Sequence, residues 1–347
     1  LGCEERWLFY AQNGVLKRSP CWRYKQTMAN FAWLDRARSV FCGRVPSQCL
    51  VAWAVLWGVA AQAQSPATVP VPPNTSASAS ASAPALRALH AQLQAQLRES
   101  PFGEPLVLVS VQADKRLQGD VYAELTLPLA RLQPVLDDAV ALCGVMFLHL
   151  NVHGCEVGAN AGAPTLTLTA GPKQASMPGA RYSMTYTMER EATAPDYVRV
   201  VLRAASGPLS TSDYHMVIEA VALDGARSWV HLGYAYRISN LAQWAMSAYL
   251  ATAGRSKIGF TVTGKDAAGQ PQYVQGERGS LERNAMRNYL ALVAYASAGA
   301  GISPALTEQR LRAWFALTER HSAQLHELSL DEYLAEKHRD LAQTPMQ

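Results

Sequence analysis

The densest group of polar side chains in this sequence lies in Glu277 to Tyr289, ERGSLERNAMRNY. Arg283 and Arg287 are four residues apart among apolar residues, so on a helix at least one of them faces the packed side. A buried guanidinium needs an acidic partner, and Glu219, the odd charge within the apolar strand pattern HMVIEAVAL, is the available acid. An Arg/Glu219 pair would either orient a carboxylate or hydroxyl group of a ligand at the polar end of a cavity, or brace a helix against a sheet.

Tyrosines supply the other candidate binding residues. Tyr234 and Tyr236 alternate along a predicted strand, and each has an apolar ring with a polar hydroxyl group at its tip. Such side chains suit the wall of a ligand pocket and a plain core equally well. Together with Glu219, Arg283 and Arg287, they make up the predicted ligand-binding residues.

Two histidines and a cysteine could in principle bind a metal. His149, His153 and Cys155 fall within FLHLNVHGC, and on a strand the two histidines would share one face. Zinc could use all three side chains only if Cys155 were not in a disulfide. We favour half-exposed strand histidines beside a disulfide, and we predict no metal site.

Patterns for covalent or nucleotide chemistry do not occur after residue 63. His326-Glu327 lacks the second histidine that a metallopeptidase helix needs. The same part of the sequence contains no G-x-S-x-G elbow, no Gly-rich phosphate loop and no C-x-x-C pair. We therefore expect no cofactor, assign no catalytic residue, and prefer binding to catalysis.

The order of strand and helix patterns determines how these residues are positioned. A leucine stripe at residues 86, 89, 93 and 97 predicts an amphipathic helix, followed by a hairpin and a helix over 129–143. The hairpin strands are predicted at 106–112 and 121–127. A later antiparallel meander covers 147–152, 165–169, 180–188, 197–204, 214–223 and 228–238, and helices are predicted over 241–251, 281–298 and 308–341. Strands first and helices afterwards indicate an α+β fold.

The N-terminal region predicts export. A basic, acid-poor run leads into a short apolar segment that closes on AQA, the pattern of a Sec-type signal peptide cleaved after Ala63. The apolar run is too short for a permanent membrane-spanning helix. We expect a signal peptide over 28–63 and a periplasmic protein. Residues 1–27, which have no helical or strand period, are interpreted as translation from ahead of Met28, with an unusually long N-terminal region of the signal peptide as the alternative.

Residues 64–84 are built from Pro, Ser, Ala and Thr and predict a flexible linker, which leaves 85–347 as a single folded domain. Residues 1–63 hold eight Lys/Arg and three Asp/Glu, so the remainder has 23 basic and 24 acidic residues. This balance gives no basic footprint for nucleic acid. Of six cysteines, Cys143 and Cys155 remain. In an oxidising compartment they favour a disulfide, with two buried free thiols as the alternative.

Two segments carry a resemblance to a known family. They are GPLSTSDYHMVIEAVALDGARSWVHLGYAYRI and the helical ERNAMRNYLALVAYAS, and with the order of elements over about residues 119–298 they resemble the START-like (SRPBCC, helix-grip) superfamily. In that family a curved antiparallel sheet wraps a long C-terminal helix around an apolar cavity. The chain differs in carrying residues 239–280 between the last strand and the long helix, and in a helical tail after Ile302.

The resemblance implies a pocket for a lipid or another hydrophobic small molecule. We therefore predict an exported, soluble, proteobacterial-type protein with a curved antiparallel sheet gripping a long helix, which binds such a ligand and has no integral membrane segment after cleavage. A cyclase- or hydrolase-type enzyme acting in the same cavity is one alternative. A periplasmic interaction protein whose helical tail binds a partner is another.

Overall fold

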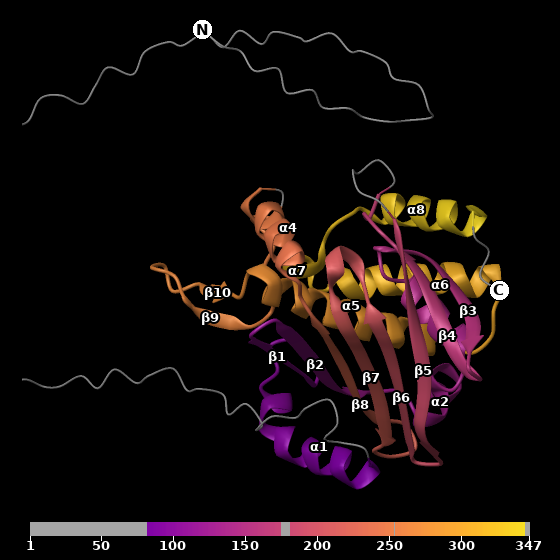
Figure 1. Ribbon diagram of the computed structural model, residues 1–347. Helices are drawn as coiled ribbons and strands as arrows, with labels where there is room; N and C mark the ends of the chain where they lie inside the picture. The colour runs from indigo at the N-terminus through magenta and orange to yellow at the C-terminus, as the bar shows by residue number, and fades with distance from the viewer. Residues whose placement is uncertain (1–81, 175–180, 253, 344–347) are drawn as a thin grey trace, which may run out of the picture. The chain divides into compact units, whose positions relative to one another are not determined.

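The computed structural model describes residues 82–174, 181–252 and 254–343 (Figure 1). The segment 1–27, the predicted signal peptide over 28–63 and residues 64–81 of the predicted linker lie outside these ranges. Within them, no helix has both the length and the apolar character that crossing a bilayer requires.

Helix α1 (Ala83–Arg98) begins within the last residues of the predicted linker. The side chain of Ser82 caps it by accepting a hydrogen bond from the backbone N–H of Ala85. The predicted leucine stripe is buried, and it packs on the outer face of the sheet in a small core of its own. That core contains Leu86, Leu89, Leu93, Leu97, Val107, Tyr122, Tyr197, Val221 and Trp229.

Eight antiparallel strands form one sheet in the order β1-β2-β8-β7-β6-β5-β4-β3. They are β1 (Leu106–Ala113), β2 (Arg116–Leu125), β3 (Val152–Asn160), β4 (Ala163–Ala170), β5 (Tyr182–Ala194), β6 (Tyr197–Ser206), β7 (Ser212–Ala222) and β8 (Ser228–Arg237). The predicted hairpin and meander are confirmed, with a tighter hairpin turn at Asp114, which has a left-handed φ of 51°.

The start of the meander was predicted wrongly. Residues 147–151 are not a strand, because α3 (Ala139–Phe147) continues to Phe147 and a turn leads into β3, which begins at Val152. The predicted helix over 129–143 is in fact two helices, α2 (Leu129–Leu136) and α3, and Asp138 caps the second by accepting from the Val140 N–H. Helix α3 is apolar and buried on nearly all sides, and an apolar run of this kind does not distinguish a buried helix from a strand.

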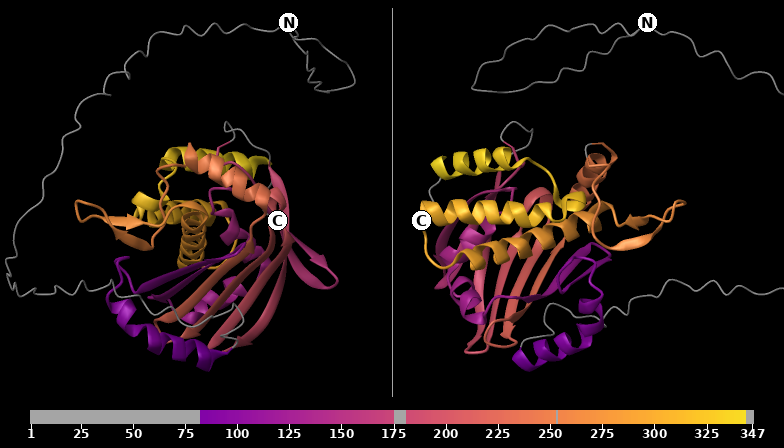
Figure 2. Two further views of the ribbon diagram at one scale, coloured as in Figure 1. Left: turned by 60° about the vertical axis from the view of Figure 1, so that its left-hand side comes forward. Right: turned by 180° about the vertical axis from the view of Figure 1, so that it is seen from behind.

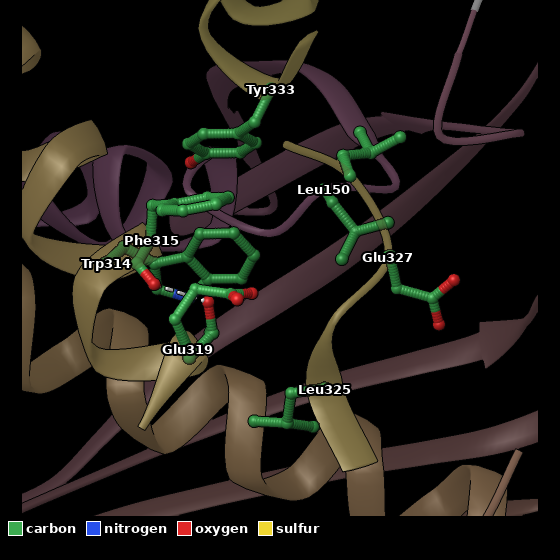
Figure 3. A pocket seen from close by; sticks show the side chains of 9 residues that line it. Leu150, Trp314, Phe315, Glu319, Leu325, Glu327 and Tyr333 are labelled. Carbon is green, nitrogen blue, oxygen red and sulfur yellow. Dashed lines mark hydrogen bonds between the residues drawn. The ribbon is translucent and has the colours of Figure 1, made fainter. Parts of the chain in front are cut away.

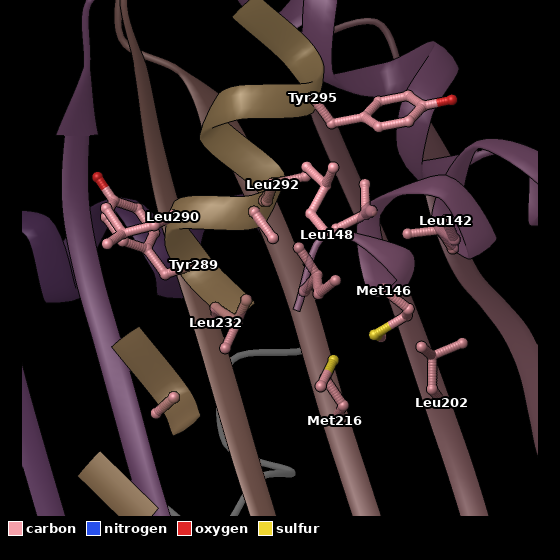
Figure 4. Close-up of a cluster of buried hydrophobic side chains, with 14 of the residues drawn as sticks. Leu142, Met146, Leu148, Leu202, Met216, Leu232, Tyr289, Leu290, Leu292 and Tyr295 are labelled. Carbon is pink, nitrogen blue, oxygen red and sulfur yellow. The ribbon is translucent and has the colours of Figure 1, made fainter. Parts of the chain in front are cut away.

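The long helix α5 (Gly276–Ala298) lies along the concave face of the sheet, which curves around it (Figure 2). Leu281, Met286 and Leu290 are fully buried there, in the main hydrophobic core. Figure 4 shows how side chains of α3, α5 and the sheet fill this layer. Helix α3 approaches α5 closely because Gly144 has no side chain where the ring of Tyr295 packs.

The C-terminal tail is helical, as predicted, but its helix over 308–341 is interrupted. It forms α6 (Pro304–Glu319), α7 (Ser322–Leu325) and α8 (Leu330–Gln343). The last break is a capping box, in which the Glu332 N–H donates to the Ser329 hydroxyl and the Ser329 N–H donates to the Glu332 carboxylate. Helix α8 packs by α3, where buried Lys337 donates to the carbonyl oxygens of residues 147, 149 and 152 at 2.6–2.8 Å.

The insertion between β8 and α5 contains α4 (Asn240–Ala251) and a two-stranded sheet of β9 (Val262–Lys265) and β10 (Pro271–Tyr273). A short 3-10 helix, η1 (Pro208–Ser210), precedes β7 and contacts α4. The predicted disulfide is present, with the Cα atoms of Cys143 and Cys155 5.4 Å apart, and it ties α3 to β3. The predicted α+β fold, a curved antiparallel sheet around a long helix with a helical tail, is confirmed.

Candidate functional site

A cavity of about 240 Å³ lies between the concave face of the sheet, α5 and the turn that follows α3. Its walls combine methionines, tyrosines and amides with small apolar side chains. The lining residues are Met146, His149, Asn151, Val152, Leu168, Ala170, Gly171, Tyr182, Met184, Tyr186, Met216, Tyr234, Asn284 and Asn288. Its volume is slightly below the range of about 300–1,000 Å³ that is usual for small-molecule sites.

Strand alternation brings the sheet residues to this cavity. Tyr182, Met184 and Tyr186 occupy every second position of β5 and therefore share one face. Met216 of β7 pairs with Tyr234 of β8 in the strand register, so these side chains are neighbours on the same face. Met146 of α3 closes the space opposite Met216 (Figure 4).

Helix α5 contributes two amides to the cavity. Asn284 and Asn288 are one helical turn apart, half-buried, and directed to the same side. Asn284 hydrogen-bonds the side chain of His149, while the Asn151 N–H donates to Nδ1 of that histidine at 3.1 Å. The ring proton of His149 therefore lies on Nε2. Burial, with the charges of Arg287 and Lys337, lowers the pKa of His149 to about 3, so this side chain is neutral.

The cavity tyrosines are also uncharged. Tyr186 and Tyr234 are joined by a side-chain hydrogen bond, and burial raises the pKa of both hydroxyl groups. Burial also raises the pKa of Tyr182, which is 38% exposed and marks the open end of the cavity. Among the described residues, no Asp, Glu, Lys or Arg lines this space.

Glu219 does not face the cavity. It shares its side of β7 with Val221, which packs against α1 on the outer face, whereas Met216 and Ile218 belong to the main core. The predicted pair between Glu219 and Arg283 or Arg287 is therefore wrong, because the sheet separates the acid from α5. Both faces of β7 are covered, so its apolar pattern does not reveal to which side the acid points.

Glu219 instead belongs to a buried ionic network on the outer face. Its carboxylate accepts from Nδ1 of His231 at 2.8 Å and from the Tyr197 hydroxyl at 2.8 Å, and it pairs with Arg199 at 3.1 Å. The other ring nitrogen of His231 lies 2.9 Å from Asp120. Burial lowers the pKa of His231, but the hydrogen bonds to Asp120 and Glu219 outweigh it and raise the pKa to about 9. This histidine is therefore charged.

Arg283 and Arg287 brace α5 against loops. Arg283 donates to the Ile258 carbonyl oxygen at 3.1 Å. Arg287 donates to the carbonyl oxygen of Leu325 and pairs with Glu327 at 3.1 Å. Burial lowers the pKa of Arg287 to about 10. Neither arginine lines the cavity.

Glu327 forms ion pairs with three cations. Besides Arg287, it pairs with Lys173 and, at 2.9 Å, with Lys257. Burial acts to raise the pKa of Glu327, but these cations outweigh it and lower the pKa to about 2. One carboxylate thus holds α5 and three segments of loop together.

A second hollow beside Glu327 is too small for a ligand. It has about 10 Å³ of space, enough for roughly one water molecule. Leu150, Trp314, Phe315 and Tyr333 line it, and Figure 3 shows the Glu327 carboxylate pointing away from these aromatic rings. We interpret it as a packing gap between α6, α7 and α8.

Of the two predicted tyrosines, Tyr234 lines the cavity and Tyr236 does not. Tyr236 is 9% exposed and stacks on Tyr214, with ring centroids 5.2 Å apart. Sequence patterns singled out Tyr234, which lines the cavity, but did not single out the cavity amides Asn284 and Asn288. Their signal was two uncharged polar residues at helical spacing beside the arginines.

His149 and His153, the two histidines considered as metal ligands, have different surroundings and different partners. Both are buried, not half-exposed as predicted, and His149 lies in a turn. His153 places its ring nitrogens 2.9 Å from Asp340 and 2.8 Å from the Pro172 carbonyl oxygen. Cys155 is in the disulfide. Across residues 82–174, 181–252 and 254–343, no group of three or more His, Cys, Asp or Glu is placed to hold a metal ion.

Comparison with known proteins finds likeness at the level of fold. No protein-family model matches the sequence, and no curated protein matches it. Similar solved structures include human STARD10, with 10% identity, 72% of this chain and 92% of that chain covered, and a TM-score of 0.31. The Zhui aromatase/cyclase from Streptomyces sp. R1128 has 12% identity, covers 60% of this chain and 94% of that chain, and has a TM-score of 0.27.

The sheet curves around α5 (Figure 2), which is the arrangement predicted from the sequence. Identities and TM-scores this low say nothing about ligand or reaction. The cavity is therefore the feature of the molecule that bears on its function.

Proposed function

We propose that this protein binds a small hydrophobic molecule in the cavity between the sheet and α5. The observation that carries the proposal is the cavity itself, with methionine and tyrosine side chains forming its apolar walls. Thioethers and aromatic rings adapt well to flat or irregular apolar ligands. A few hydrogen-bonding groups among them would fix the orientation of a ligand.

The polar groups of the cavity favour an uncharged ligand. Asn284 and Asn288 offer amides, Tyr186 and Tyr234 offer hydroxyl groups, and His149 is neutral. A carboxylate entering this space would lose its hydration without gaining a cation in the lining, which is costly. In the sequence, the two arginines suggest a ligand carboxylate, but neither arginine lines the cavity. We therefore propose a neutral ligand that carries one or two hydroxyl or carbonyl groups.

The titration of these groups supports binding over catalysis. A general acid or base works best when its pKa lies near the operating pH. The pKa of His149 is lowered to about 3, and the pKa values of Tyr182, Tyr186 and Tyr234 are raised from an already high value. No cavity group with a shifted pKa is thus poised for proton transfer at neutral pH, which weakens the cyclase or hydrolase alternative.

We further propose that binding takes place in the periplasm, after cleavage at Ala63. The leader-like pattern of residues 28–63 supports export. The disulfide between Cys143 and Cys155 supports an oxidising compartment. N-terminal sequencing of the exported protein tests the cleavage position, and a product that retained the apolar run over 49–63 would contradict it.

A pair of dyes tests the ligand class. The neutral dye prodan should bind with a blue-shifted emission, and the anionic dye anilinonaphthalene sulfonate should bind more weakly. Ala170 lies in the cavity wall, so Ala170→Leu fills part of the space and should weaken prodan binding by about tenfold or more. Mass spectrometry of an organic extract of the purified protein would then identify any co-purified neutral ligand.

Ala163→Leu is the matched control, because Ala163 is half-buried at the other end of the same strand and does not line the cavity. It should leave prodan binding unchanged. Equal binding by the wild type and Ala170→Leu would overturn the cavity as the site. Preference for the anionic dye, lost in Ala170→Leu, would overturn the neutral ligand.

A further inference from the structure

Helix α4 has an exposed apolar face. Leu241, Trp244 and Ala248 follow the spacing i, i+3, i+7 and lie on one side of the helix, while Ala242 on the other side is buried. Leu241 is 52% exposed and Trp244 is 72% exposed. Leu209 of the neighbouring η1 is 50% exposed, and its carbonyl oxygen accepts from the Ser239 hydroxyl at the start of α4. A surface of large exposed apolar side chains marks an interaction site.

Exposed cations flank this face at both ends of the α4 region, and one exposed acid, Asp213, follows η1. Helix α4, NLAQWAMSAYLA, contains no charged residue. The sequence from 225 to 265 contains no Asp or Glu but five Lys and Arg residues, Arg227, Arg237, Arg255, Lys257 and Lys265. Of these, Arg227 pairs with Asp224 and Lys257 pairs with Glu327. Arg237 directly precedes the α4 region and Arg255 follows it, and both are exposed. An uncharged apolar face between exposed cations is complementary to an anionic surface that has an apolar interior.

The same face stands at the open end of the cavity. Tyr234 lines the cavity three residues before β8 ends, and α4 begins just after that strand. On the neighbouring strand, η1 lies just before β7, which supplies Met216 to the cavity. Figures 1 and 2 show α4 beyond the ends of these strands. Tyr182, the exposed lining residue, begins β5 at that end of the sheet, with β6 between β5 and β7.

We propose that α4 and η1 dock the protein onto the surface of an anionic lipid bilayer. Leu209, Leu241 and Trp244 enter the interfacial region, and Arg237 and Arg255 contact the anionic headgroups. A bilayer fits better than a second copy of this chain, because a two-fold contact would bring the same cations face to face. The proposal concerns the outer surface and does not depend on what the cavity binds.

Hydrogen exchange of the full chain with vesicles tests this docking site. The peptide over 240–252 should exchange more slowly with phosphatidylglycerol/phosphatidylcholine vesicles than without them, and pure phosphatidylcholine should give less protection. Exchange is measured at α4 because the apolar run over 49–63 can itself bind lipid. In the double variant Leu241→Ser/Trp244→Ser, vesicle affinity at this site should fall by about tenfold or more, since two apolar side chains no longer enter the interface.

Ile302→Ser is the matched control, because Ile302 is 61% exposed on the loop between α5 and α6. It should leave the protection of 240–252 unchanged, as should Ala170→Leu in the cavity wall. High salt should weaken the protection, because the headgroup contacts are screened. Unchanged exchange of 240–252 with anionic vesicles would overturn the proposal. So would a vesicle-independent dimer, seen by sedimentation, that the double variant abolishes.

Discussion

The two faces of the sheet shift the pKa of a buried histidine in opposite directions. His149 at the concave-face cavity and His231 on the outer face are both almost fully buried, at 8% and 5% exposure. Burial lowers the pKa of His149 to about 3, whereas the pKa of His231 rises to about 9. Burial alone therefore does not determine their charge.

The neighbours make the difference. His149 is bonded to a backbone N–H and an amide, and the nearby charges of Arg287 and Lys337 oppose its protonation. His231 lies between the carboxylates of Asp120 and Glu219, which compensate its charge. The outer face thus keeps its ions paired within the protein, and the cavity face stays neutral and open to an uncharged ligand.

The largest expected effect on stability comes from removing Glu219, the acid at the centre of the outer network. Glu219→Gln leaves the buried cations His231 and Arg199 without a shared partner. We expect a loss of about 3–5 kcal/mol in the free energy of unfolding, measured by denaturant titration. The variant should retain prodan binding under native conditions, because Glu219 lies on the other side of the sheet.

Glu319→Gln is the control for that substitution. Glu319 pairs with His326 at the surface, where the two side chains are 30% and 55% exposed. Its loss should change stability by less than about 0.5 kcal/mol. If Glu219→Gln were as stable as Glu319→Gln, the outer network would have no role in holding the sheet.

The raised pKa of His231 should also make the stability of the protein depend on pH, with a smaller effect than that of Glu219→Gln. The folded protein holds the His231 proton more tightly than the unfolded chain, whose pKa is 6.5. Its contribution of about 3 kcal/mol should be complete below pH 6.5 and disappear as the pH rises through about 9. Denaturant titrations across this window check it, and the slope should flatten in His231→Gln.

The cavity histidine supplies the internal control. Nuclear magnetic resonance of the ring carbons should show His231 titrating near pH 9 while His149 keeps the shifts of a neutral ring down to about pH 3. Two histidines that titrated together near 6.5 would contradict the assignment of opposite environments to the two faces.

Sequence patterns identified much of the fold because local periodicity suffices for it. The leucine stripe of α1 and the alternation of β5 each have one buried face that sequence spacing reveals. The breaks in the C-terminal tail were harder to predict, because the break at Ser329 depends on a capping box within an otherwise helical run. The disulfide could be predicted by elimination, since two cysteines remained after residue 63.

The site was only partly predictable, for a physical reason. Tyr234 follows from strand alternation, but the partner of Glu219 does not, because α1 covers the outer face and makes both sides of β7 apolar. Arg283 and Arg287 were predicted to bind a ligand because buried charges need a partner. In the structure, loop carbonyl oxygens and Glu327 are those partners. The cavity amides carry no charge, and their helical spacing does not by itself indicate a cavity. Tertiary packing determines their role.

The smallest expected effect separates the two predicted tyrosines on the cavity side of β8. Tyr234→Phe removes the hydroxyl group that bonds Tyr186 in the cavity, and stability should change by no more than about 1 kcal/mol. Prodan affinity should fall by roughly fivefold, because the dye loses one polar contact. Tyr236→Phe, two residues along the same strand, is the matched control, and fluorescence titration should give it the affinity of the wild type because Tyr236 does not line the cavity. Equal losses in the two variants would mean that the aromatic cluster as a whole, and not the cavity hydroxyl, determines binding, and the polar anchor assigned to Tyr234 would then be wrong.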